Sequence, residues 1–301
     1  MMRELVVISG KGGTGKTSIT ASLAALFEKT VIVDCDVDAA DLHLLLQPEI
    51  RKQERFVSGV EPLIDQKICI KCGQCREVCV FDAISEEFEI QSVHCEGCGV
   101  CARFCPENAI QLNDRECGEW YLSKTRFGSM LHARLGIAEE NSGKLVTLLK
   151  KEARNLAEKE NDELILVDGS PGIGCPVISS LTGADLVLIV TEPTISGVHD
   201  FIRVLDLIDH FKLSAGVIVN KADLNPEKTK EICQVAENRQ HEILGQIVYD
   251  PVFTQAMIQG KTLIEYDQGQ IKKSIEKIHR KIIQKFEDDN AQTQENALDQ
   301  Q

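Results

Sequence analysis

The chain has 301 residues, with 33 basic and 47 acidic side chains and a formal net charge of −14. This balance disfavours nonspecific binding to nucleic acid or anionic lipid, because both are negatively charged. No apolar run approaches the roughly 18 residues of a membrane span and no signal-peptide pattern opens the chain, so a cytoplasmic location is expected. The 12 cysteines then indicate metal or redox chemistry, because reducing compartments disfavour disulfides.

Six short apolar runs are expected to form buried strands of a parallel sheet, whose two faces are covered by crossover helices. They lie at residues 4–9, 30–34, 163–168, 185–193, 216–220 and 243–250. Helices are expected at 16–27, 142–159, 196–211 and 226–239, some of which begin with Ser or Pro. The pattern predicts an α/β fold with a doubly wound, mostly parallel sheet, in which ligands bind at the carboxyl ends of the strands.

A phosphate-loop motif follows the first expected strand, where residues 9–17 read SGKGGTGKT. The stretch 10–17 fits G-x-x-x-x-G-K-[ST] and precedes an expected helix. Backbone amides over 12–16 would cradle phosphates at the helix N-terminus, Lys16 would reach the β and γ phosphates, and Thr17 would bind Mg²⁺. The residues predicted to bind nucleotide in this stretch are Gly10, Lys11, Gly12, Gly13, Thr14, Gly15, Lys16, Thr17 and Ser18.

The segment KGGTGKT resembles the deviant Walker A motif of the ParA, MinD, Mrp and nitrogenase iron-protein class of P-loop ATPases. In that class, the resemblance implies, the earlier lysine, here Lys11, crosses a dimer interface to the nucleotide of the opposite subunit. Such a lysine would act as an arginine finger does and would link ATP binding to dimer closure. A solvated Lys11 without a role is the alternative. The resemblance covers nearly all of 1–62 and 115–285 and implies a slow, partner-stimulated ATPase.

The segment VIVDCDVDAADL ends an expected strand in several acidic residues. By resemblance to switch I of the same class, Asp36 is predicted to position the attacking water and is counted as catalytic with Lys11 and Lys16. Asp34, Asp38 and Asp41 are close enough in sequence to leave that choice open.

Three later segments resemble further landmarks of the class. In LILVDGSPGIG, the resemblance implies that Asp168 holds Mg²⁺ through water and that Gly172 senses the γ-phosphate. In VIVNKAD, Asn220 and Asp223 would contact the base, and in YDPVF, Pro251 would lie near the adenine. A plain strand-end capping role suits Asp34 and Asp223 as well as a direct one.

Residues 63–114 break the α/β pattern and contain two copies of one unit, CIKCGQCREVCVFDAI and CEGCGVCARFCPENAI. Both have the C-x2-C-x2-C-x3-C spacing of bacterial ferredoxins, in which the fourth cysteine ligates the neighbouring cluster. Zinc would instead need isolated cysteine pairs or cysteine with histidine. Two [4Fe-4S] clusters are therefore predicted. Their ligands are Cys69, Cys72, Cys75 and Cys105 for the first, and Cys95, Cys98, Cys101 and Cys79 for the second.

The predicted domains are an ATPase domain at 1–62 and 115–286, an inserted ferredoxin-like α+β domain at 63–114, and a disordered polar tail at 287–301. The whole resembles MinD-superfamily ATPases with an inserted ferredoxin domain. An apolar stripe before the tail is expected to pack on the sheet, with a basic membrane-surface helix as the disfavoured alternative. The stripe is Ile271, Ile275, Ile278, Ile282 and Phe286.

Cys175, seven residues after Asp168, is expected to be a small buried residue. The alternative is a ligand of a cluster shared between two subunits, as in the nitrogenase iron protein.

Three functions suit these features: an ATP-gated redox protein, an Mrp-like metallocluster assembly factor, and a MinD- or ParA-like positioning ATPase with the insert as redox sensor or adaptor. Complete cluster ligation favours electron transfer, whereas the resemblance to MinD-like ATPases with ferredoxin insertions favours assembly. These two are placed jointly above positioning. The expected cofactors are ATP, Mg²⁺ and two [4Fe-4S] clusters. The expected partners are an identical or similar ATPase subunit and a redox or metallocluster protein, and no nucleic acid.

Overall fold

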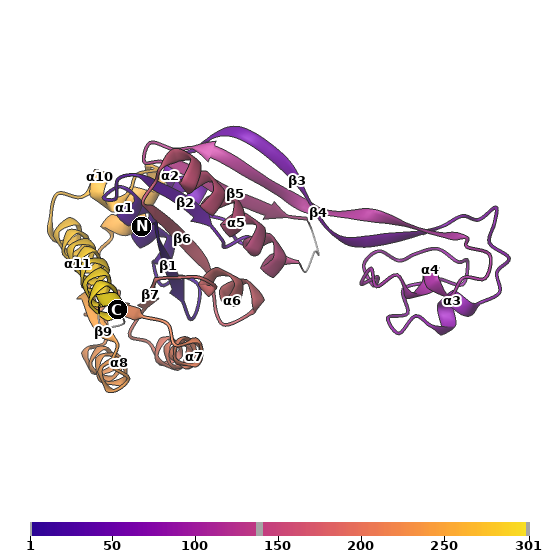
Figure 1. Cartoon of the computed structure of the whole chain (residues 1–301). Helices are drawn as coiled ribbons and strands as arrows, with labels where there is room; N and C mark the ends of the chain where they lie inside the picture. Colours follow the sequence, from indigo (N-terminus) through magenta and orange to yellow (C-terminus); the bar gives the residue numbers. More distant parts are fainter. Residues whose placement is uncertain (1, 137–140, 299–301) are drawn as a thin grey trace. The chain divides into compact units, whose positions relative to one another are not determined.

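The computed structural model describes residues 2–136 and 141–298, with side chains described up to residue 289. The chain divides into two compact units (Figure 1). The first unit contains Met1–Gln53, Trp120–Arg134 and Ser142–Gln301, and the second contains Glu54–Glu119 and Leu135–Asn141. The second unit is therefore wider than the predicted insertion at 63–114.

The strands follow the order β3-β4-β5-β2-β6-β1-β7-β8-β9. From β5 to β9 the strands pair in parallel, and central β1 pairs with both β6 and β7. Six of these strands were predicted. They are β1 (Arg3–Ser9), β2 (Thr30–Asp34), β6 (Leu164–Pro171), β7 (Leu186–Thr191), β8 (Ala215–Val219) and β9 (Glu242–Gln246).

Three strands were not predicted: β3 (Glu49–Ile64), β4 (Ile110–Lys124) and β5 (Ser129–Leu135). β3 reads EIRKQERFVSGVEPLI and exposes its first seven residues, so it lacks the apolar run of a buried strand. Its position at the end of the strand order explains this composition, since charged side chains protect an edge strand from further pairing. β3 and β4 each have residues in both compact units, which accounts for the different boundary.

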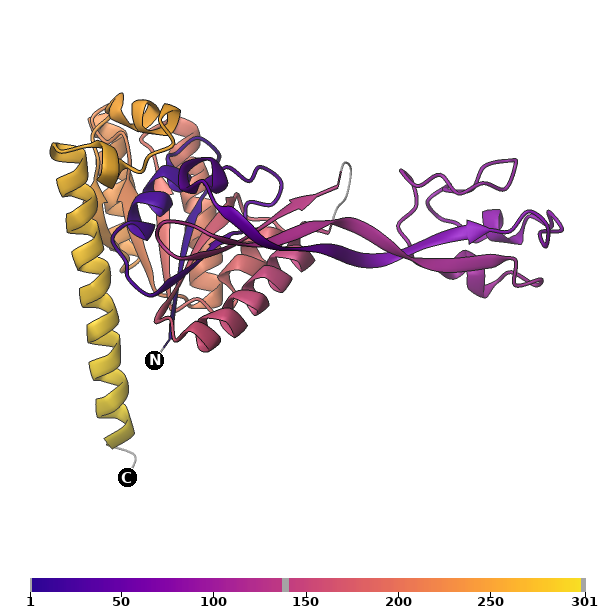
Figure 2. The same cartoon turned by 90° about the horizontal axis from the view of Figure 1, so that it is seen from above.

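Helices cover both faces of the parallel sheet (Figures 1 and 2). Alternate residues of a strand point to opposite faces, and Leu5 and Val7 of β1 pack with α1 and α11 in one apolar core. That face carries α1 (Lys16–Ala24), α2 (Leu42–Leu46), α9 (Val252–Ile258), α10 (Leu263–Tyr266) and α11 (Gln270–Leu298). The other carries α5 (Ser142–Glu160), α6 (Cys175–Leu181), α7 (Ile195–Phe211) and α8 (Pro226–Asn238). The doubly wound, mostly parallel α/β prediction is confirmed.

The five apolar residues predicted to line one face of α11 are buried in this core, so the packing prediction is confirmed. The disordered tail is not found where the structure describes it, because α11 continues to Leu298. A helix propagates easily once its first turns are anchored, and the Gln, Glu and Ala that follow are good helix formers. Residues 299–301 lie outside the described part. No helix among the described residues is both long and apolar enough to cross a membrane.

The second unit repeats its backbone conformation as well as its sequence. Gly73 and Gly99, which hold equivalent places in the two copies, have φ values of 86° and 72°. Each immediately precedes a short helix, α3 (Gln74–Glu77) or α4 (Val100–Arg103). Asp82 and Asn108, also equivalent, have φ values of 48° and 50°. The internal duplication predicted from the sequence is thus visible in the fold.

Candidate functional site

The phosphate loop lies between β1 and α1 at the carboxyl end of the sheet. Gly13 and Gly15 have φ values of 77° and 91°, which side chains with a Cβ rarely adopt. A Cβ on Gly15 would lie 2.4 Å from Asn220 Nδ2, and one on Gly10 would lie 2.7 Å from the backbone of Asp200. The glycines therefore let the loop turn and let neighbouring elements approach it closely.

Three side chains of the site meet at Asp168, at the end of β6. Lys16 Nζ lies 2.9 Å from Asp168 Oδ1, and Thr17 Oγ1 donates to Asp168 Oδ2 at 2.9 Å. Thr20 Oγ1, which was not predicted, donates to Asp168 Oδ1 at 2.8 Å. Asp168 is only 1% exposed. The structure thus brings together Lys16, predicted to bind phosphate, and the two residues predicted to hold Mg²⁺.

Lys16 keeps its charge in this setting. Burial favours the neutral amine, but the carboxylates of Asp168 and Asp36 outweigh burial and raise the pKa of Lys16. Within the described residues, Lys16 Nζ and Thr14 Oγ1 are nevertheless buried without a hydrogen bond of good geometry. Buried donors without acceptors are unfavourable. Phosphate oxygens would satisfy both, so the residues present fit a nucleotide phosphate.

The four acidic candidates after β2 have different surroundings. Asp34 is fully buried, and its two oxygens accept backbone hydrogen bonds from Asp36 at 3.1 Å and Leu42 at 3.2 Å, so it shapes the loop. Asp36 Oδ2 lies 3.7 Å from Lys16 Nζ. Asp38 and Asp41 are exposed. Asp36 is therefore the candidate nearest the phosphate loop after Asp168.

The ionisation of Asp36 is also perturbed. Burial and the nearby carboxylates raise its pKa to about 6, although Lys16 opposes the shift. A carboxylate with this pKa is mostly ionised at neutral pH and changes its charge within a physiological range.

The remaining predicted nucleotide contacts have other partners in this structure. The amide of Gly172 donates to Ser9 O at 2.8 Å. Asn220 is buried, and its Nδ2 donates to Thr14 O at 2.8 Å, which braces the phosphate loop. Pro251 is exposed at the start of α9, and its close neighbour Phe253 approaches Gly15. The base-recognition roles of Asn220 and Pro251 stay predictions.

Lys11 lies in a set of acceptors from its own chain. Its Nζ is 2.6 Å from Glu192 Oε1 and donates to Thr194 Oγ1 and Ser196 Oγ, both at 3.0 Å. Lys221 Nζ binds the other oxygen of Glu192 at 2.7 Å and also donates to Gly13 O at 3.0 Å. Glu192 and Lys221 were not predicted. Their positions in TEP and NKAD, directly after two strands of the nucleotide edge, were the available signal.

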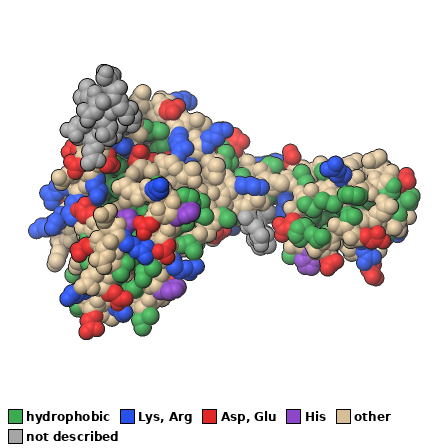
Figure 3. Space-filling model, turned by 60° about the horizontal axis from the view of Figure 1, so that its bottom comes forward, with side chains coloured by type: hydrophobic (Ala, Val, Ile, Leu, Met, Phe, Trp, Pro, Cys, Tyr) green, Lys and Arg blue, Asp and Glu red, His purple; other side chains and the backbone are tan. Residues whose placement is uncertain are grey.

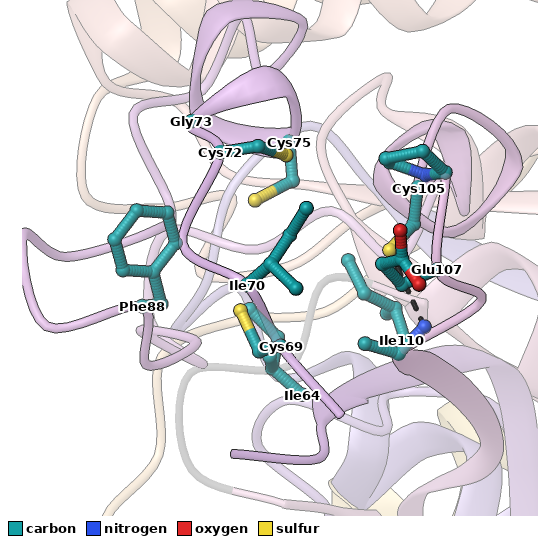
Figure 4. A pocket seen from close by; sticks show the side chains of 12 residues that line it. Ile64, Cys69, Ile70, Cys72, Gly73, Cys75, Phe88, Cys105, Glu107 and Ile110 are labelled. Atoms are coloured by element: carbon teal, nitrogen blue, oxygen red, sulfur yellow. Dashed lines mark hydrogen bonds between the residues drawn. The ribbon is translucent and has the colours of Figure 1, made fainter. Parts of the chain in front are cut away.

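The predicted cluster ligands line two hollows in the second unit. The first cysteine hollow is lined by Cys69, Cys72, Cys75 and Cys105, together with apolar side chains including Ile64, Ile70 and Ile110 (Figure 4). The second cysteine hollow is lined by Cys79, Cys95, Cys98 and Cys101. In each hollow three cysteines come from one sequence copy and the fourth comes from the other, which is the grouping predicted from the spacing.

The fourth cysteine of each copy has the same backbone contact. Cys79 Sγ accepts a hydrogen bond from the amide of Ala83 at 3.4 Å, and Cys105 Sγ accepts one from Ala109 at 3.3 Å. Amide hydrogen bonds to sulfur stabilise cluster thiolates. Among the described residues, no three or more His, Cys, Asp or Glu side chains are grouped closely enough for a single metal ion.

The remaining cysteines divide into buried and accessible ones. Cys35 and Cys117 are buried, and Cys233 is partly buried. Cys175 is exposed, so the prediction of a buried residue is wrong. It is the first residue of α6, and the buried residues of that helix begin only at Val177.

Comparison with known proteins places the chain in a family. A model described as CobQ/CobB/MinD/ParA nucleotide binding domain matches residues 5–264. The uncharacterized protein MJ0578 of Methanocaldococcus jannaschii is 34% identical over 286 residues, 94% of this chain and 97% of that protein. Pyruvate synthase subunit PorD of Methanothermobacter marburgensis is 40% identical over 52 residues, 17% of this chain and 64% of that subunit.

A solved structure of the septum site-determining protein MinD with Mg-ADP, from Pyrococcus horikoshii, has the same fold. Its TM-score is 0.56 at 19% identity, and the match covers 94% of this chain and 96% of that one. The family model spans the phosphate loop, Asp36, Asp168 and Asn220. The chain therefore belongs to the CobQ/CobB/MinD/ParA nucleotide-binding family.

Proposed function

We propose that this protein is an ATPase that closes into a dimer on binding Mg-ATP and carries two [4Fe-4S] clusters in its second unit. ATP-driven closure would be coupled to electron transfer or metallocluster assembly on a partner protein. The observation that carries the ATPase proposal is the convergence of Lys16, Thr17 and Asp168, with unsatisfied donors beside them. Family membership and the Mg-ADP bound to the similar MinD structure support it.

Each residue of the nucleotide site would have a distinct role. Lys16 would neutralise the β and γ phosphates, and Thr17 and Asp168 would hold Mg²⁺, Asp168 through water. Asp36, ionised at neutral pH, would position the attacking water. Lys11 would contact the nucleotide of the opposite subunit, so that hydrolysis requires closure. The partner subunit would be a second copy or a similar ATPase.

The cluster proposal is supported by the two cysteine hollows. Their four-cysteine linings, with ligands exchanged between the copies, follow the spacing of two-cluster ferredoxins. Such clusters supply one-electron transfer when they are bound. The protein's own contribution is to provide eight thiolates, two of which accept amide hydrogen bonds. Five of the eight belong to a small apolar core or pack against it.

The test begins with protein purified without oxygen. About eight iron atoms per chain are expected for two complete clusters, and a non-hydrolysable ATP analogue should convert monomer to dimer in sedimentation. Lys11→Ala should still bind nucleotide but neither dimerise nor hydrolyse ATP. Negligible iron would refute the cluster proposal, and a Lys11→Ala variant that hydrolyses ATP normally would refute the role of Lys11 in the opposite subunit.

A second measurement separates electron transfer from cluster assembly. The reduced protein is mixed with ATP, an iron chelator and an oxidised viologen dye as one-electron acceptor, and the absorbance of the clusters is followed. Reoxidation with retention of iron supports electron delivery, whereas ATP-dependent loss of iron to the chelator supports assembly.

The alternative is a positioning ATPase that uses the second unit as redox sensor or adaptor. The fold similarity to MinD, including the MinC:MinD complex of Aquifex aeolicus with a TM-score of 0.56 at 20% identity, favours keeping it. A fluorescent fusion that forms an ATP-dependent localised pattern would support positioning. A fusion that stays diffuse with and without Lys16→Ala would count against it.

A further inference from the structure

The ammonium of Lys11 uses all its hydrogen-bonding capacity within its own chain. A lysine ammonium has three donors, and three acceptors surround this one: Glu192 Oε1, Thr194 Oγ1 and Ser196 Oγ. The lysine can therefore reach another acceptor only by giving up bonds that it already has.

These acceptors lie in the loop between β7 and α7 and in the first turn of α7. Thr194 is the N-cap of α7, and its Oγ1 also accepts the amide of Gly197 at 3.0 Å. A Cβ on Gly197 would lie 2.2 Å from Glu192 O, so the glycine allows the loop to lie against the first turn of the helix. The side chain of Glu192 is only 12% exposed. The acceptor set is thus part of the folded framework.

Glu192 also has a second cation, which changes the energetics of releasing the first. Lys221 binds its other oxygen at 2.7 Å. Burial works against ionisation of Glu192, but bonds from both lysines outweigh burial and lower its pKa. A buried carboxylate that lost its sole cation would be strongly unfavourable. Because Lys221 remains, Lys11 can leave without stranding that charge.

We propose that Glu192 is a positioning residue that stores Lys11 within its own subunit and sets the nucleotide concentration needed for dimer closure. This inference rests on the proposed function, in which Lys11 serves the nucleotide of the opposite subunit. Closure then exchanges the Glu192, Thr194 and Ser196 acceptors for phosphate oxygens. Holding Lys11 within its own subunit opposes dimer closure at low nucleotide concentration. Because Lys221 still neutralises Glu192 after Lys11 has left, the exchange of acceptors is reversible.

The inference predicts a gain of function, which sets it apart from a purely structural role. Glu192→Gln retains the size and an acceptor but removes the charge, so Lys11 is held less tightly. The concentration of AMPPNP that gives half-maximal dimer in sedimentation should fall about fivefold, the scale expected for one partly exposed ion pair per subunit. Ser196→Ala removes one neutral acceptor and should lower it about twofold.

The monomer's affinity for ADP is measured in parallel to show that the phosphate loop is intact. Glu163→Gln is the matched control, since Glu163 pairs with Lys29 at 2.7 Å on an exposed surface and should leave dimerisation unchanged. If Glu192→Gln does not fold, Ser196→Ala alone decides. An unchanged or higher AMPPNP requirement with normal ADP binding overturns the inference. A wild-type protein that never dimerises with AMPPNP instead refutes the proposed function.

Discussion

The two units of this protein are stabilised by different means. In the first, strands such as β1 and β6 are almost completely buried between helices, and Leu5, Ile32 and Phe201 are fully enclosed. The second unit has, among its described residues, a small apolar cluster with six buried members, which include Cys75 and Cys101. It also exposes large apolar side chains, which gather on the face shown in Figure 3. Val80 and Val93, for example, are 84% and 85% exposed.

From this difference we expect one unit, and not the other, to need a bound ligand in order to fold. A sheet covered on both faces buries enough apolar surface to fold by itself. A unit of roughly 70 residues with so small a core usually needs an additional constraint, such as bound metal. When metal binds only the folded form, its binding energy becomes folding energy. The second unit should therefore lose its structure without the proposed clusters, and the first should keep its structure without nucleotide.

Removing iron should have the largest effect, on the structure of the second unit. Amides in the second unit should exchange hydrogen at least about 100-fold faster after chelation, while those of β1 and β6 keep their protection, as measured by hydrogen exchange with mass spectrometry. Cys101→Ser should lose about half of the iron, and Cys233→Ser, a cysteine outside the hollows, should lose none. Equal hydrogen-exchange protection of the second unit with and without iron would contradict the claim that this unit needs iron to fold.

Lys16→Ala tests whether damage to the nucleotide site affects the second unit. Removing a buried cation at the phosphate loop should weaken ADP binding by at least about 100-fold, the scale of charged hydrogen bonds to phosphate, in calorimetric titration. Iron content should stay at the wild-type level. Lys29→Ala, which changes an exposed lysine, is the control for nonspecific loss of charge. Loss of iron in Lys16→Ala would show that the two sites are not independent.

The self-sufficiency of the first unit can be probed in its core. Ile275 is completely buried in the stripe of α11, so Ile275→Ala should lower the free energy of unfolding of this unit by about 3 kcal/mol in urea titration. Ile283, at 36% exposure on the same helix, provides the matched control, and its change to alanine should have an effect below about 1 kcal/mol. Similar losses in both variants would mean that α11 is not packed as described.

The stability of the protein should also depend on pH through Asp36 of the nucleotide site, and this effect should be small. Asp36 has its pKa raised to about 6 by burial, so between pH 4 and 6, approximately, the folded state binds more protons than the unfolded state. Its contribution to stability therefore falls as pH rises through this window. Without nucleotide and Mg²⁺, Asp36→Asn should be more stable than wild type at pH 7 by on the order of 1 kcal/mol, because partial solvation reduces the effect.

The stability difference between Asp36→Asn and the wild type should shrink as pH falls through this window and be smallest below about pH 4, where Asp36 becomes protonated in both the folded and the unfolded state. Thermal unfolding across the range measures this. ATP hydrolysis by the wild type should show the opposite trend and fall as pH drops through about 6, because the proposed role of Asp36 needs the carboxylate. An Asp36→Asn stability difference that does not depend on pH would contradict the raised pKa.

Much of this architecture could be predicted from local patterns. The apolar runs that became β1, β2 and β6 to β9 are buried on both faces, so their composition alone indicates strands. β3 and β4 escaped prediction because they are charged and partly exposed, and strand pairing with a distant segment does not appear in a local window. Cys175 was misplaced for a related reason, since burial depends on which side of α6 the fold covers.

Features that depend on residues close together in the chain could be recognised from the sequence alone. They are the glycines and lysine of the phosphate loop, the cysteine spacing, and the apolar stripe of α11. Two contacts could be seen only in the tertiary structure. They are the approach of Asp36 to Lys16 and the hydrogen bond from Lys11 to Thr194, which is 183 residues away in the chain. The physical reason is that spacing along the chain constrains short-range geometry directly. Contacts between distant residues exist only after the sheet has packed and brought its strand ends together.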